Sequence, residues 1–142
     1  MRLQVVAGLR TFADAHDAAN IGLTDDRWAL EVSDGLSVNA ARARFMAALY
    51  EAVLAAAEGG DSASALAEAD LQFEAGKTVI ARRHAALHDP VSERLIVDGG
   101  NPTLYDYGYL TNAETLCFWR RELGEARELL LGESWSDPGC TL

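Results

Sequence analysis

The stretch SASALAEADLQFEAGKTVIARRHAALH, residues 62–88, decides the fold class. It contains no proline and one glycine, and its large apolar side chains recur every three or four residues, which is the period of a helix. At about 100° per residue, Leu66, Phe73 and Ile80 fall on one stripe. Gly76 lies in the same stripe, where its small size lets a second helix approach closely. The stretch therefore predicts a long helix with one buried face.

The rest of the chain shows the same period, divided by turn signals. Asn20-Ile21-Gly22 and Glu58-Gly59-Gly60 are typical helix ends, and Asp61 or Ser62 is expected to cap the helix after the second of them. Asp34-Gly35 is read as another end, so Ser37 or Asn39 is expected to cap a new helix. A capping box at 111–114 supports an alternative in which the last helix breaks near 108–111. The predicted longer helices span about residues 2–18, 37–58, 62–88 and 102–131, and the two short ones about 24–34 and 90–97.

These elements predict an all-α fold. No segment alternates like a strand, and 25 alanines against 3 prolines favour helix. We expect a single-domain irregular helical bundle of about four longer and two short helices, over residues 1–132. Residues 133–142 are expected to form a flexible C-terminal tail.

Two further helices have predicted core faces. Spacing of three and four places one stripe on the first helix and one on the last. These stripes are Val5, Leu9, Phe12, His16 and Ala19 on the first helix, and Tyr105, Tyr109, Asn112, Leu116, Trp119, Leu123, Ala126 and Leu130 on the last.

The charge balance excludes several classes of partner. With 22 acidic and 12 basic residues the formal net charge is −10, which argues against nucleic acid and against a polybasic membrane contact. No apolar run reaches the ~18–20 residues of a membrane span. The start of the chain does not resemble a signal peptide, so we expect a cytoplasmic protein. No cofactor is implied.

One lysine stands among eleven arginines, and it leads to a candidate pocket. Lys77 falls at the margin of the apolar stripe of residues 62–88, and His84 falls inside it. Buried polar groups must be paired, so these residues could form one internal network that lines a small-molecule pocket. The pocket candidates are Lys77, His84, His16, Asn112, Tyr105, Tyr109, Asp70 and Glu74. In the alternative, Lys77 reaches water and pairs with Asp70 or Glu74.

Other patterns give weaker candidates. His84 and His88 are one helical turn apart, and with His16 they are candidate metal ligands, although no glutamate follows His84 as a zinc protease requires. Tyr107 and Asp106 are candidate contacts for a ligand or partner. The paired arginines at 82–83 and 120–121 read as a solvated face without a role.

These observations lead to one main functional hypothesis and two alternatives. The main one is a small acidic, non-catalytic module that binds a protein partner or self-associates. The second is a helical bundle whose internal polar pocket binds or transforms a small molecule. The third is a metal-binding bundle. Whether the chain is an enzyme stays open.

Overall fold

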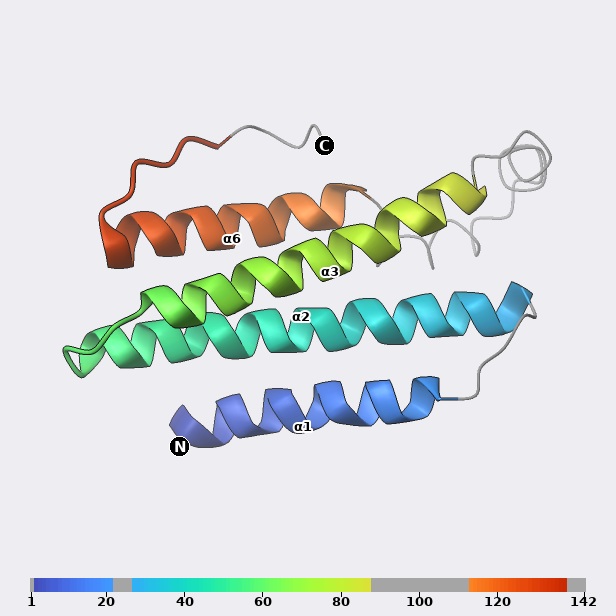
Figure 1. Ribbon diagram of the computed structural model, residues 1–142, viewed down its shortest axis with the longest axis horizontal. Helices are drawn as coiled ribbons and strands as arrows, with labels where there is room; N and C mark the ends of the chain where they lie inside the picture. The colour runs from blue at the N-terminus through green and yellow to red at the C-terminus, as the bar shows by residue number, and fades with distance from the viewer. Residues whose placement is uncertain (1, 22–26, 88–112, 138–142) are drawn as a thin grey trace.

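Four helices make up the fold. The computed structural model describes residues 2–21, 27–87 and 113–137, which contain α1 (Arg2–Asn20), α2 (Arg27–Ala57), α3 (Ala63–Leu87) and α6 (Ala113–Leu131), and no strand. Consecutive helices among these run in opposite directions (Figure 1). The predicted all-α bundle is confirmed. None of the helices in the described ranges is both long and apolar enough to cross a membrane.

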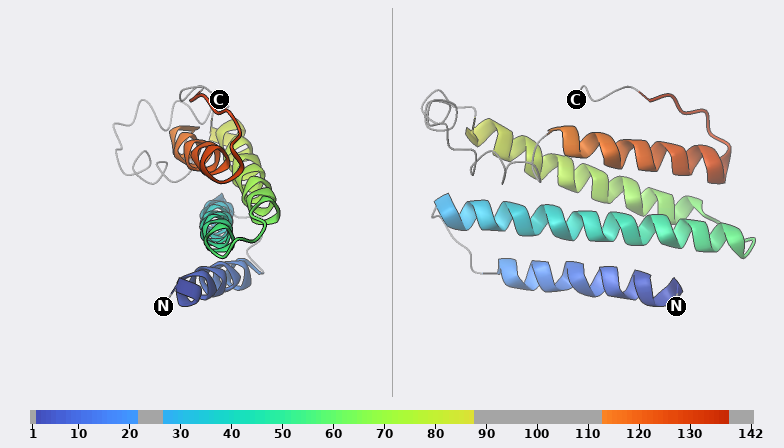
Figure 2. Two further views of the ribbon diagram at one scale, coloured as in Figure 1. Left: turned by 90° about the vertical axis from the view of Figure 1, so that its left-hand side faces the viewer. Right: turned by 180° about the vertical axis from the view of Figure 1, so that it is seen from behind.

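Helix α2 is at the centre of the bundle and α1 is at its edge. Helix α2 packs against α1, α3 and α6, whereas α1 packs mainly against α2. Viewed along the helices, α1 lies on the far side of α2 from α6 (Figure 2). The larger core lies among α2, α3 and α6, and a smaller one, of Ala13, Ala40 and Ala43 with Leu9 against them, lies between α1 and α2.

The turn between α2 and α3 follows the predicted signals. Gly59 has a φ of +73°, and the Gly60 N–H donates to the Ala55 carbonyl at 2.8 Å, which together end α2 in a Schellman motif. The Asp61 carboxylate accepts a hydrogen bond from the Ala63 N–H at 2.8 Å at the start of α3. The buried Ser62 hydroxyl donates to the Ala52 carbonyl at 2.9 Å. The predicted end at 58–60 and the cap at 61–62 are both confirmed.

The predicted break at Asp34-Gly35 is wrong, because α2 continues through it. Asp34 is buried and pairs with Arg82 of α3, so its carboxylate serves a contact between helices. Ser37 does not cap a helix either, since its hydroxyl oxygen accepts a hydrogen bond from the Asn20 amide of α1 at 3.0 Å. A glycine inside a helix costs only about 1 kcal/mol, which these contacts offset at Gly35. The predicted short helix at 24–34 is therefore the first part of α2, as far as the described residues reach.

The predicted core face of α1 is confirmed at Leu9, which packs against the smaller core, but it is wrong at Val5, Phe12 and Ala19. Val6 and Ala13 are buried, whereas Val5 and Phe12 are about half exposed and Ala19 is exposed. The facing surface of α2 explains the difference. It is built of alanines that bring the two helices close together, which leaves room for Ala13 but none for a phenyl ring.

The predicted stripes of α3 and α6 are confirmed where side chains are described. Trp119 of α6 is buried with its ring 5.4 Å from that of Phe45 in α2. The other edge of the Trp119 ring lies on Gly76 of α3, where an added Cβ would fall 2.8 Å from Cζ3 and 3.1 Å from Cη2. The ring of Trp119 therefore occupies the space that Gly76 leaves empty. The short helix expected at 90–97 and the alternative break near 108–111 lie outside the described residues.

Gly76→Ala is expected to destabilise the fold. The added methyl group overlaps the Trp119 ring, and overpacking of this kind typically costs about 1–3 kcal/mol, more than the gain of up to about 1 kcal/mol in helix propensity. Urea denaturation followed by circular dichroism measures the difference in unfolding free energy.

Gly35→Ala is the matched control. Gly35 also lies inside a helix, and an added Cβ there meets nothing within 4 Å. This variant should be as stable as the natural chain or more stable. If Gly76→Ala proves as stable as Gly35→Ala, the close contact with Trp119 does not control the packing of α3 against α6.

Candidate functional site

Lys77 of the predicted pocket lies in solvent. Its side chain is 49% exposed, and Nζ is 3.1 Å from Glu74 Oε1 on the preceding turn of α3. Asp70 is also exposed and meets Arg127 of α6 at 3.3 Å. The arrangement is the one foreseen in the alternative, in which Lys77 reaches water and pairs with a neighbouring acid.

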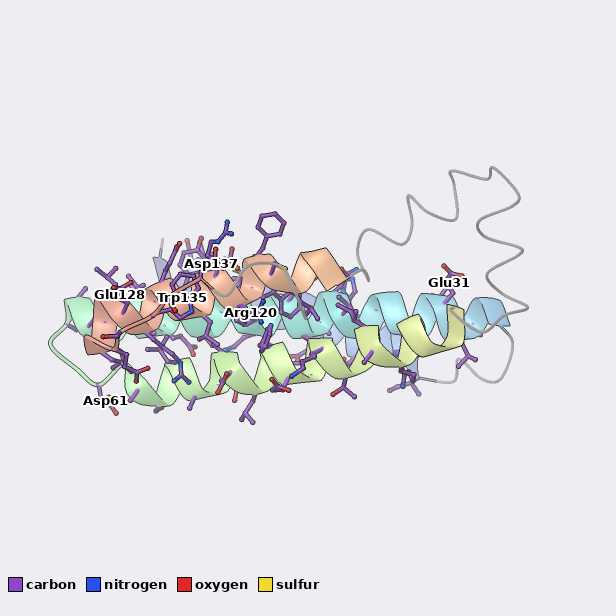
Figure 3. The ribbon with its side chains drawn as sticks, turned by 90° about the horizontal axis from the view of Figure 1, so that it is seen from above. Glu31, Asp61, Arg120, Glu128, Trp135 and Asp137 are labelled. Atoms are coloured by element: carbon purple, nitrogen blue, oxygen red, sulfur yellow. The ribbon has the colours of Figure 1, made fainter. Side chains whose placement is uncertain are left out.

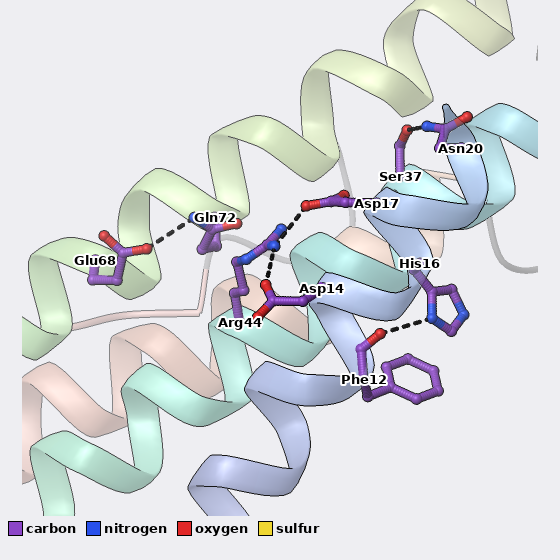
Figure 4. A network of polar contacts seen from close by, with 9 residues as sticks. All are labelled: Phe12, Asp14, His16, Asp17, Asn20, Ser37, Arg44, Glu68 and Gln72. Carbon is purple, nitrogen blue, oxygen red and sulfur yellow. Dashed lines mark hydrogen bonds and ion pairs between the residues drawn. The ribbon is translucent and has the colours of Figure 1, made fainter. Parts of the chain in front are cut away.

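His16 makes its contacts within α1. Its Nδ1 is 2.9 Å from the Phe12 carbonyl oxygen, so Nδ1 is the donor of this hydrogen bond (Figure 4). The two rings are tilted by 37° to each other, with their centroids 3.9 Å apart. Lys77 likewise bonds within its own helix. The structure does not join His16 to Lys77.

The remaining predicted residues are not described. His84 belongs to α3, but its side chain lies outside the described part, as do all of the residues His88, Asn112, Tyr105, Tyr109, Asp106 and Tyr107. Within the described ranges, no group of three or more histidine, cysteine, aspartate or glutamate residues is placed to hold a metal ion.

Sequence reasoning missed the contacts that arginines make between elements. Arg82, read as part of a solvated face, pairs with the buried Asp34. Arg42 of α2 reaches Glu122 of α6 with both Nη atoms, one at 2.9 Å, and its guanidinium lies 5.1 Å from the Trp119 ring centroid. These pairs depend on how neighbouring helices align, and spacing along one helix does not reveal that alignment.

One edge of the α1–α2 interface carries a charged network. Arg44 of α2 lies 2.9 Å from Asp14 and 2.6 Å from Asp17 of α1 (Figure 4). Arg10 of α1 holds Glu51 of α2 at 2.7 Å. Around each helix these residues fall on a single side. This edge of the interface is therefore polar between residues 10 and 17 of α1.

The network keeps its cations charged. The hydrogen bond to Glu51 raises the pKa of the Arg10 guanidinium, and the hydrogen bond to Asp17 raises the pKa of Arg44, although burial opposes both shifts. A pKa raised by folding means that the fold favours the charged guanidinium, so each arginine stabilises the fold at neutral pH, where its partner carboxylates are ionised. This stabilisation is lost as the pH rises through the raised pKa of the arginine.

The opposite edge of the same interface is apolar. Phe12 and Val5 lie roughly opposite Asp14 around α1, and Val53 lies about 180° from Arg44 around α2. Both residues of α1, together with Val53 and the adjacent Tyr50, are about half exposed. Large apolar side chains thus gather on the edge that the charged network leaves open.

Helix α6 extends this apolar edge. The Arg42–Glu122 pair shows which sides of α2 and α6 meet. Val53 lies about 20° from Arg42 around α2, and Leu129 lies about 20° from Glu122 around α6. Val53 and Leu129 therefore lie on the same side of the bundle. Phe118, 61% exposed, shares the side of Leu129. We call the set Val5, Phe12, Tyr50, Val53, Phe118 and Leu129 the apolar side.

The outer face of α1 adds a second feature. Between Gln4 and Asn20, the charged residues are Arg10, Asp14 and Asp17, and all three pair with α2. The outward residues are exposed and uncharged: Gln4, Ala7, Gly8, Thr11, Ala15, Ala18 and Ala19. In a chain of net charge −10, this edge helix presents a neutral outer face.

No protein family, curated protein or solved structure matches the chain.

Arg44→Met is expected to lower the unfolding free energy by up to about 1 kcal/mol, because Asp14 and Asp17 lose their shared cation and repel each other. The loss should shrink as salt is added, since salt screens that repulsion. Urea denaturation at low and high ionic strength measures both effects.

Lys77→Met removes an exposed cation whose one ion pair among the described residues lies within a single helix. This control should change stability by less than about 0.5 kcal/mol. Equal losses for Arg44→Met and Lys77→Met would mean that the network does not fasten α1 to α2.

Proposed function

We propose that this chain is a non-catalytic protein-interaction module, and that it docks through the outer face of α1 together with the adjacent apolar side. The observation that carries the proposal is the neutral outer face on an edge helix, bordered by the half-exposed Val5 and Phe12. Contiguous exposed apolar surface on a soluble chain commonly marks an interaction site.

The proposed occupant is a second copy of α1. Like charges repel when two chains of net charge −10 meet, so the neutral face offers the approach with the least repulsion. The face is also self-complementary in shape. Gly8 and Ala15 flank Phe12, and an antiparallel copy can place its own Phe12 beside these small residues. At 19 residues, α1 offers about 28 Å of helix for such a pair.

The alternative functions gain less support. A small-molecule pocket would need Lys77 and His16 to converge, and each bonds within its own helix. No described group of side chains favours a metal centre. Pocket and metal binding stay hypotheses for the side chains that lie outside the described ranges.

Phe12→Asp is the test of the proposed surface. The side chain is half exposed, so the substitution should leave the helix folded while placing a charge in the centre of the proposed interface. Sedimentation velocity from low to high micromolar concentration is expected to show dimers of the natural chain and monomers of Phe12→Asp.

Leu71→Asp serves as the control. Leu71 is 65% exposed on α3, away from the apolar side, so this variant should dimerise like the natural chain. A natural chain that stays monomeric throughout, or dimers of Phe12→Asp as stable as those of the natural chain, would refute the proposal.

A further inference from the structure

The segment after α6 returns along that helix and places a tryptophan on a glycine. Gly124 is buried in the middle of α6, and the indole of Trp135 lies against it. Figure 3 shows Trp135 on the segment that returns along α6. A Cβ added at Gly124 would overlap Nε1, Cε2 and Cδ1 of the indole. Because Gly124 has no side chain, it leaves a space that the indole of Trp135 occupies. We call this space the seat.

Two ion pairs flank this seat. Asp137 binds Arg121, with Nη2 at 2.6 Å and Nε at 2.9 Å, and Glu133 meets Arg127 at 3.4 Å. Arg121 and Arg127 lie on either side of Gly124 along α6, three residues away in each direction. Arg127, Gly124 and Arg121 thus contact three side chains of the segment: an acid, an indole two residues later and a second acid two residues after that.

The turn after α6 brings the segment Glu133–Asp137 back onto the helix that it follows, so the segment binds its own chain. Gly132 has a φ of +70°, and its N–H donates to the Glu128 carbonyl at 3.0 Å, which ends α6 and turns the chain back. Only this turn separates Glu133 from the helix to which it binds. A ligand tethered so closely has a local concentration in the millimolar range, so even weak affinity keeps the seat filled.

We propose that α6 carries a peptide-binding site, formed by Arg121, Gly124 and Arg127, for short segments in which a tryptophan lies between two acidic residues. The segment Glu133–Asp137 of the chain fills this site in cis. A segment of the same pattern from another protein is the ligand class, and it binds in trans when the chain's own tryptophan is absent or displaced. Guanidinium forks recognise carboxylates, and a bare stretch of backbone admits the flat face of an indole.

This site is separate from the apolar side. Gly124 lies about 120° around α6 from Phe118, and neither Val5 nor Phe12 takes part in it. The inference therefore does not rest on the proposed dimer, and peptide binding should be the same in the Phe12→Asp variant.

The experiment uses the full chain with Trp135→Ala, which empties the seat and leaves the helices unchanged. The probe is a fluorescent synthetic peptide with the sequence of residues 132–137, followed by anisotropy. Trp135→Ala should bind it at least about tenfold more tightly than the natural chain, whose own segment competes. A peptide with tryptophan replaced by alanine should bind at least about tenfold more weakly, as should one with both acids replaced by their amides.

The double variant Gly124→Ala, Trp135→Ala fills the seat with a methyl group and should lose binding, while circular dichroism reports whether α6 is intact. Four results would each overturn the proposal, and three of them concern binding to the emptied seat. They are absence of binding to Trp135→Ala, equal binding of the altered peptides, and equal binding to folded Gly124→Ala, Trp135→Ala. Equal affinity of the natural chain and Trp135→Ala would also overturn it, because the tail would then not occupy the site.

Discussion

The contact of Trp119 with the bare backbone of Gly76 is the constraint on which the rest of the larger core depends. It brings α6 close to α3, and the same indole lies beside Phe45 of α2, so one side chain joins three helices. Arg42 completes the junction, because its guanidinium lies over both rings while its Nη atoms hold Glu122. The aromatic packing aligns α6 with α2, and the ion pair then fixes which side of α6 faces outward. The exposure of Phe118 and Leu129 follows from that alignment.

Arginine is the residue that this fold uses between elements. Six arginines in the described part each pair with an acid on a different element: Arg10, Arg42, Arg44, Arg82, Arg121 and Arg127. The planar guanidinium presents several donors at once, so it can grip a carboxylate with two atoms or bridge two carboxylates, as Arg44 does. The single lysine pairs within its own helix. The imbalance between arginine and lysine thus has a structural counterpart at the contacts between elements.

The parts of the fold that sequence predicts are those governed by local spacing. The buried stripe of α3 and the caps at 58–62 follow from periodicity and glycine chemistry, which act within a few residues. Asp34-Gly35 failed as a helix end because the deciding partner, Arg82, is 48 residues away. The predicted core face of α1 failed at Phe12 because hydrophobicity alone favours that residue, whereas the alanine surface of α2 packs against Ala13. The candidate site depends on alignment between helices, and no spacing rule within one helix contains that information.

The distribution of charge connects the two docking features. Each charged side chain of α1 between Gln4 and Asn20 is paired with α2, so the strongly acidic character of the chain does not extend to the outer face of that helix. Beside Gly124 on α6, by contrast, Arg121 and Arg127 offer cations that acids of the tail neutralise. A neutral face excludes charged partners through the cost of burying an unpaired charge, whereas a cationic seat admits acidic ones. The two proposed surfaces therefore differ in the charge they accept: the first suits an uncharged helix and the second an acidic segment.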